Sequence, residues 1–101
     1  MAVFYIGSYD IDNMELFQQY PPKVLALLPK YGGKVLASDI SATVLEGKAK
    51  TMNAIIQFPS EEAVLNMYNS PEYHEIRKIR HNSTSNCTMV IVKEYNAEDK
   101  K

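Results

Sequence analysis

Apolar and β-branched residues gather in four short runs, and helical spacing marks the segment after the first run and the segment before the last. The runs predicted as strands are residues 3–9, 34–40, 51–58 and 87–95. Turn-forming or helix-capping residues bound each of them, which is the usual setting of a short strand. Residues 41–50 predict a polar hairpin connection between the second and third strands. The predicted order is strand, helix, strand, strand, helix, strand.

The first helical segment opens with a capping pattern in which the cap is the carboxylate of Asp12 or the carboxamide of Asn13, and Glu15 follows three residues after Asp12. The pair Pro21-Pro22 removes two backbone donors and pushes the preceding residue toward extended geometry. We therefore expect two short helical pieces instead of one straight helix. The pair Gly32-Gly33 ends the region, because glycine readily takes the left-handed conformation of a helix end.

Two serine caps divide the second helical segment. Ser60 precedes Glu61-Glu62, whose carboxylates suit the positive end of a helix dipole. Ser70 and Pro71 then start another helix, with proline at the first helical position, where it costs no hydrogen bond. The polar run 82–86 predicts a loop before the last strand.

This order of elements predicts the α+β class, as a ferredoxin-like βαββαβ sandwich with a four-stranded antiparallel sheet. Right-handed crossovers place both helical layers on one face of such a sheet. In the last strand Met89 and Ile91 face one side while Val90 and Val92 face the other, so neither side suits solvent. A second copy packed against the open sheet face is the expected cover, which predicts a homodimer.

The composition predicts one domain, residues 1–95, followed by a charged, flexible tail at 96–101. The chain has 11 basic and 12 acidic side chains, and this balance argues against partners such as nucleic acid or an anionic membrane. Its single cysteine, Cys87, excludes an intrachain disulfide and favours a reducing compartment. Because the first residues lack the pattern of a secretory signal, we expect a cytoplasmic protein.

Short motifs with a shared order run through most of the chain: Tyr31-Gly32-Gly33-Lys34, Val44-Leu45-Glu46-Gly47, Phe58-Pro59-Ser60, Ala63, Tyr68, Ser70-Pro71-Glu72-Tyr73 and Arg80. In this string the chain resembles the bacterial domain-of-unknown-function family numbered thirteen-thirty. The resemblance implies a dimeric α+β barrel, a superfamily that includes cofactor-independent monooxygenases and muconolactone isomerase-like enzymes. What these share is a small cavity between sheet and helices. The chain departs from the family at Ala37-Ser38-Asp39, where many members carry an arginine followed by glycine.

Candidate ligand-binding residues are a matched arginine and three tyrosines. Arg80 corresponds to the family arginine, and a guanidinium is suited to bidentate capture of a carboxylate. The alternative is that Arg80 only complements the negative end of its helix. Tyr5, Tyr9 and Tyr68 are predicted to supply aromatic walls with hydroxyl tips to a pocket, and the alternative for them is core or dimer packing.

Candidate catalytic residues are Asp39 as a general base and His74 as a proton carrier. The alternatives are that Asp39 guards an edge strand against unwanted pairing and that His74 is a surface residue. No metal-ligand spacing is present, and we expect neither a metal nor a cofactor. The leading hypothesis is a homodimer that binds a small, partly apolar or anionic metabolite. A cofactor-independent isomerase or monooxygenase-like enzyme, and a structural or partner-binding dimer without a ligand, remain open.

Overall fold

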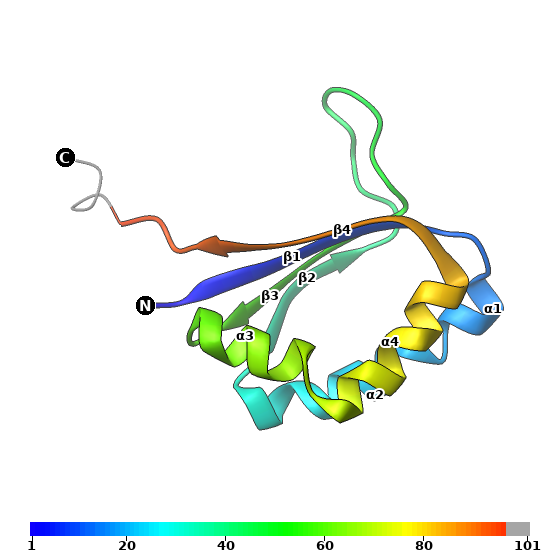
Figure 1. The fold of residues 1–101 in the computed structure, drawn as a ribbon. Helices are drawn as coiled ribbons and strands as arrows, with labels where there is room; N and C mark the ends of the chain where they lie inside the picture. The colour runs from blue at the N-terminus through cyan, green and yellow to red at the C-terminus, as the bar shows by residue number, and fades with distance from the viewer. Residues whose placement is uncertain (97–101) are drawn as a thin grey trace.

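The computed structural model of this protein describes residues 1–96, and Figure 1 shows their arrangement. A four-stranded antiparallel sheet in the order β2-β3-β1-β4 carries every helix on one face. The elements are β1 (Val3–Ile11), α1 (Met14–Phe17), α2 (Tyr20–Leu27), the 3-10 helix η1 (Leu28–Tyr31), β2 (Lys34–Asp39), β3 (Met52–Phe58), α3 (Glu61–Tyr68), α4 (Pro71–Ser83) and β4 (Thr84–Lys93). The predicted α+β, ferredoxin-like fold is confirmed. Of the predicted tail, residues 97–101 lie outside the described residues.

The first helical segment is broken into short pieces as predicted, but the extended geometry predicted before Pro21-Pro22 is wrong, because Tyr20 is the first residue of α2 and the prolines follow it in the helix. The cap of α1 is Asn13, whose side-chain oxygen accepts a hydrogen bond from the Leu16 amide at 3.0 Å, so of the two predicted cap residues the carboxamide is the one used. The Asp12 amide donates instead to the Ser83 carbonyl at 2.8 Å, which ties the start of α1 to the end of α4. Gly32 ends η1 with φ 76°, the left-handed conformation predicted for it.

Both predicted serine caps are present. The Ser60 hydroxyl oxygen accepts a hydrogen bond from the Ala63 amide at 3.1 Å at the start of α3. Ser70 caps α4 in the same way, accepting from the Tyr73 amide at 3.1 Å while its hydroxyl donates to the Met67 carbonyl at 2.7 Å. Because Ser70 is buried and joins two helices, it holds Tyr73 at a fixed place above the sheet.

We expect Ser70→Ala to lower the free energy of unfolding by about 1–2 kcal/mol, the usual range for a lost cap. The buried Tyr73 amide and Met67 carbonyl lose their shared partner, and water has little access to replace it. Ser60→Ala is the matched control, because Ser60 is an exposed cap with one such bond. Urea unfolding followed by circular dichroism measures both. Equal losses in the two variants would contradict the role assigned to burial at Ser70.

The loop predicted at residues 82–86 is wrong, because α4 continues to Ser83 and β4 begins at the next residue. Polar side chains that resemble a loop in sequence satisfy the helix end instead. The Ser83 hydroxyl donates to the Ile79 carbonyl at 2.6 Å, and the Thr84 hydroxyl donates to the Arg80 carbonyl at 2.5 Å. The chain can therefore pass from helix to strand without a connecting segment.

The core fills the space between the helices and the inner sheet face. Alternate residues of β1 and β3 point into it, which follows from the two-residue period of a strand. Its most enclosed side chains come from every layer: Val3, Leu28, Phe58, Val64, Met67 and Tyr73. This packing sets the floor and walls of the cavity described below.

The opposite face of the sheet carries a band of apolar side chains. Ile6 on β1 pairs with Ile55 on β3 and Val90 on β4, and Phe4 lies two residues away beside Val92. In the single chain Ile55 is 36% exposed and Val90 43%. No helix of residues 1–96 covers this side, and the β2–β3 connection rises from it (Figure 1). We call these five residues the apolar band.

Candidate functional site

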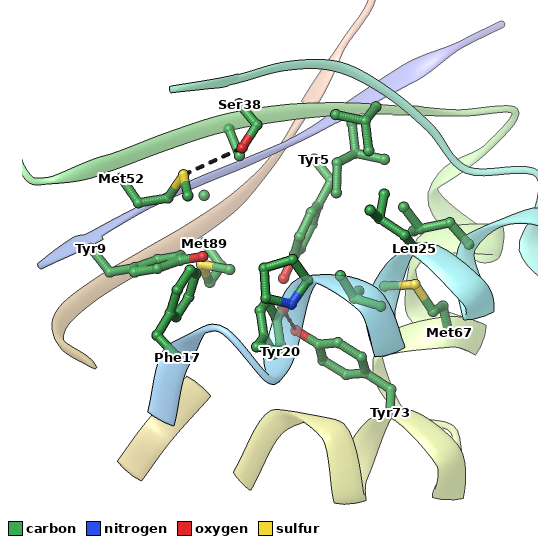
Figure 2. A pocket seen from close by; sticks show the side chains of 17 residues that line it. Tyr5, Tyr9, Phe17, Tyr20, Leu25, Ser38, Met52, Met67, Tyr73 and Met89 are labelled. Carbon is green, nitrogen blue, oxygen red and sulfur yellow. Dashed lines mark hydrogen bonds between the residues drawn. The ribbon is translucent and has the colours of Figure 1, made fainter. Parts of the chain in front are cut away.

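A cavity of about 190 Å³ lies between the inner sheet face and the helices. Its walls are mainly apolar and aromatic side chains from β1, β3 and the helical layer (Figure 2). The lining residues Leu25 on α2 and Val35 on β2 are well exposed, whereas the tyrosines at the other end are buried. The cavity therefore opens between α2 and the edge strand β2, and it narrows toward a group of hydroxyls.

The hydroxyls come from three tyrosines that meet at the inner end of the cavity. The hydroxyls of Tyr20 and Tyr73 form a hydrogen bond of 2.7 Å, in which either one donates. Tyr5 points its hydroxyl toward this pair (Figure 2), and Tyr73 lies near enough to raise the pKa of Tyr5, but no hydrogen bond of acceptable geometry joins the Tyr5 hydroxyl to a partner within residues 1–96. A buried polar group without a partner is uncommon in folded proteins and calls for an explanation.

Arg80 lies behind this wall and is fully buried. Its guanidinium carbon is 5.8 Å from the centre of the Tyr9 ring, and Tyr9 lines the cavity. None of the three guanidinium nitrogens has a hydrogen-bond partner with acceptable geometry in the described part of the chain. Burial acts to lower the pKa of Arg80, whereas neighbouring Tyr73, Tyr20 and Tyr5 act to raise it and prevail, so the side chain stays charged at any physiological pH.

The tyrosines around the cavity are neutral donors. Burial is the main cause that raises the pKa of Tyr5, Tyr20 and Tyr9 above the ordinary value for tyrosine, although Arg80 acts in the opposite direction on all three. Their hydroxyls therefore keep their protons near neutral pH. The group can donate hydrogen bonds to a ligand, but it does not offer a phenolate base.

The structure brings together three of the four predicted ligand-binding residues. Tyr5 and Tyr9 line the cavity, and Arg80 lies against Tyr9. The fourth, Tyr68, supports the wall from behind, since its ring centre lies 6.3 Å from that of Tyr5 and 5.5 Å from that of Tyr73. A role of Tyr68 in binding stays a prediction, since its ring contacts two residues of the cavity wall from the side away from the cavity.

The two predicted catalytic residues lie away from the cavity walls and from each other. Asp39 ends β2 on the sheet side opposite Ser38, which lines the cavity, and its Oδ1 accepts a hydrogen bond from the Ser41 amide at 2.7 Å. His74 is exposed on α4, where its Nδ1 lies 3.3 Å from a nitrogen of Arg77. Their catalytic roles stay predictions.

Two cavity tyrosines are absent from the predicted binding residues. Tyr20 is the first residue of α2, and both it and Pro21 line the cavity. Tyr73, part of the motif Ser70-Pro71-Glu72-Tyr73, carries the hydroxyl that meets Tyr20. Met52, Met67 and Met89 also line the cavity, and nothing in their spacing indicated that they would meet.

Two classes of site and structure are absent from residues 1–96. No three histidine, cysteine, aspartate or glutamate side chains lie close enough to hold a metal ion there. Within the same residues, no helix has the length and apolar character needed to cross a bilayer.

Sequence comparison places almost the whole chain in one family. Residues 2–95 match the family described as domain of unknown function (DUF1330). The chain belongs to DUF1330. The resemblance seen in the sequence motifs is thereby confirmed. A search of curated protein sequences gives no significant match to this DUF1330 protein.

Several solved structures share the fold of this DUF1330 protein at low sequence identity. A protein of unknown function from Rhodopseudomonas palustris has a TM-score of 0.80 and 18% identity, covering 94% of this chain and 83% of its own. A dimeric ferredoxin-like protein of unknown function from Jannaschia sp. CCS1 has a TM-score of 0.79 and 10% identity, covering 93% and 100%. A candidate antibiotic biosynthesis monooxygenase from Caulobacter crescentus has a TM-score of 0.62 and 10% identity, and the match covers 94% of this chain and 91% of that protein. At these identities the likeness shows the fold alone.

Proposed function

We propose that this DUF1330 protein is a homodimer whose protomers each bind one small, partly apolar or anionic metabolite in the cavity. The observation that carries the proposal is the Tyr5 hydroxyl, which is buried, lines the cavity and has no partner within residues 1–96. An apolar chamber with a few convergent polar groups is the usual form of a small-molecule site. The cavity favours this function over a structural dimer with a filled interior.

The size of the cavity limits the ligand to a compact molecule. At about 190 Å³ it is smaller than the roughly 300–1,000 Å³ of drug-sized sites. Apolar cavities of about 150 Å³ can hold a molecule the size of benzene. The ligand we propose is therefore close to one ring with a polar substituent, or a short aliphatic chain, with its apolar end toward Leu25 and Val35 and its polar end toward Tyr5.

The homodimer forms through the open sheet face. Apolar side chains from three adjacent strands form a continuous band there, and such a patch on a lone protein usually marks an interaction surface. The Jannaschia protein, which shares the fold over 93% of this chain, is described as dimeric. A two-fold interface places the same band of both copies against each other. A bacterial cytoplasm suits this protein, whose one cysteine, Cys87, is exposed and free.

The second candidate function is a cofactor-independent isomerase or monooxygenase-like enzyme. The likeness of fold to the Caulobacter protein favours it, and Asp39 or His74 is the proton carrier in that case. Turnover of a substrate found by screening is then measured against pH in Asp39→Asn and His74→Gln. A rate that neither substitution changes removes this candidate.

The binding function predicts that filling the cavity abolishes ligand binding. Ala54 on β3 lines the cavity, so Ala54→Leu places three extra carbons inside it. Native mass spectrometry of the protein from its own cells shows whether a ligand is already bound. Thermal-shift screening of compact aromatic and short-chain metabolites then identifies ligands of the wild type. At ten times Kd, a ligand raises Tm by several degrees, since it contributes about 1.4 kcal/mol. We expect Ala54→Leu to lose that shift.

The matched control is Ala26→Leu, the same change at an exposed site on α2 outside the cavity. It should keep the full thermal shift. A panel without any stabilising compound, together with a dimer that carries no extra mass, would contradict the binding function. So would a ligand whose shift is the same in Ala54→Leu as in the wild type.

A further inference from the structure

The buried charge of Arg80 has no counter-charge in the described part of the protein. The side chain is fully enclosed, and the ion pairs of residues 1–96 join Lys30 to Glu72 and Lys78 to Glu75. The groups that raise the pKa of Arg80 are Tyr73, Tyr20 and Tyr5, and a tyrosine supplies a counter-charge only when it ionises in alkali. A guanidinium removed from water without an anion or hydrogen-bond acceptors is strongly unfavourable. An arrangement this costly suits a cation that acquires its partner from solution.

The tyrosine hydroxyls lie between the charge of Arg80 and the cavity. In the Tyr20–Tyr73 pair one hydroxyl donates to the other, which leaves one proton free to donate elsewhere. The hydroxyl proton of Tyr5 is the second one available for donation, and Tyr5 lines the cavity. Arg80 lies behind these groups, with Tyr9 between its guanidinium and the cavity. Two donors thus face the inner end of the cavity with a fixed positive charge behind them, which is an arrangement suited to an anion.

We infer that the ligand is a monocarboxylate, whose oxygens accept hydrogen bonds from Tyr5 and from the Tyr20–Tyr73 pair and whose negative charge is balanced by Arg80 behind these tyrosines. This inference rests on the proposed binding function and names its ligand class. One buried cation balances one negative charge, so a phosphate dianion or a dicarboxylate would keep an unpaired charge. The remaining walls are apolar and suit a small ring or a short chain.

The test compares ligands of the same size that differ in charge. Benzoate and benzyl alcohol are titrated into the wild type, Arg80→Met and Lys78→Met by isothermal calorimetry. We expect the wild type to bind benzoate about 10–100-fold more tightly than benzyl alcohol, the range for hydrogen bonds to a charged group. Arg80→Met should lose this preference, since methionine is flexible and carries no charge. Lys78→Met should keep it, because Lys78 is an exposed cation on the same helix and pairs with Glu75.

A second readout separates an anion site from a structural anchor. Without ligand, Arg80→Met should melt at a higher temperature than the wild type, because the substitution removes an unpaired buried charge. A lower Tm would overturn the inference. Equal affinity of the wild type for benzoate and benzyl alcohol would overturn the carboxylate but leave the pocket, whereas no binding of either would count against both. Tyr5→Phe gives an independent comparison that keeps Arg80 in place, and it should weaken benzoate binding while sparing benzyl alcohol.

Discussion

Ile55→Asp should convert the proposed homodimer into monomers at micromolar concentration. Ile55 lies at the β3 side of the apolar band, beside Ile6, and it is 36% exposed in the single chain, so the protomer itself tolerates a polar side chain there. In the dimer the carboxylate is buried against the partner's apolar band, which costs at least about 2 kcal/mol. A two-fold interface contains the substitution twice. The free energy of dimerisation is therefore less favourable by about 4 kcal/mol, which weakens the association constant about 10³-fold.

Leu65→Asp provides the matched control, since Leu65 is 45% exposed on α3, on the helical side of the sheet. Sedimentation equilibrium over a concentration series measures the monomer–dimer constant of both variants. The control should associate like the wild type. If Ile55→Asp remains as dimeric as Leu65→Asp, then the sheet face is not the interface.

The sequence predicted the strands and most helix starts because these depend on neighbouring residues. Ser60 and Ser70 cap the helices that follow them directly, and Gly32 takes the left-handed conformation within its own turn. The end of α4 was missed for a related reason. Ser83 and Thr84 resemble loop residues, yet their hydroxyls bond to carbonyls of the preceding helical turn. Polar composition alone does not distinguish these two uses.

The site was predicted only in part because it depends on contacts between distant segments. The hydroxyls of Tyr20 and Tyr73 meet although 53 residues separate them, and no local pattern indicates that pairing. Arg80 was chosen for its guanidinium chemistry and its place in the family motif. Its full burial without a counter-charge follows from the packing of α4 on the sheet, which the sequence does not specify locally. The same packing leaves Asp39 and His74 on the surface.

The buried tyrosines predict a steep loss of stability in alkali. Tyr5, Tyr9 and Tyr20 are each less than 10% exposed, and burial holds their pKa values well above 10 in the folded chain. Above pH 10 the unfolded chain releases these three protons while the folded chain retains them. Because the unfolded state then binds fewer protons, stability falls as pH rises, by about 1.4 kcal/mol per pH unit for each tyrosine. Together they remove roughly 4 kcal/mol by pH 11, and below pH 9 they have no such effect.

Urea unfolding at pH 9, 10 and 11 measures this loss, with phenolate absorbance recorded in the same samples. Tyr9→Phe removes one of the three groups, so it should lose about one third less stability than the wild type over this range. The comparison between the two proteins cancels the ionisation of lysines, which both share. Phenolate absorbance from Tyr5, Tyr9 or Tyr20 that appears while the chain is still folded would contradict the prediction.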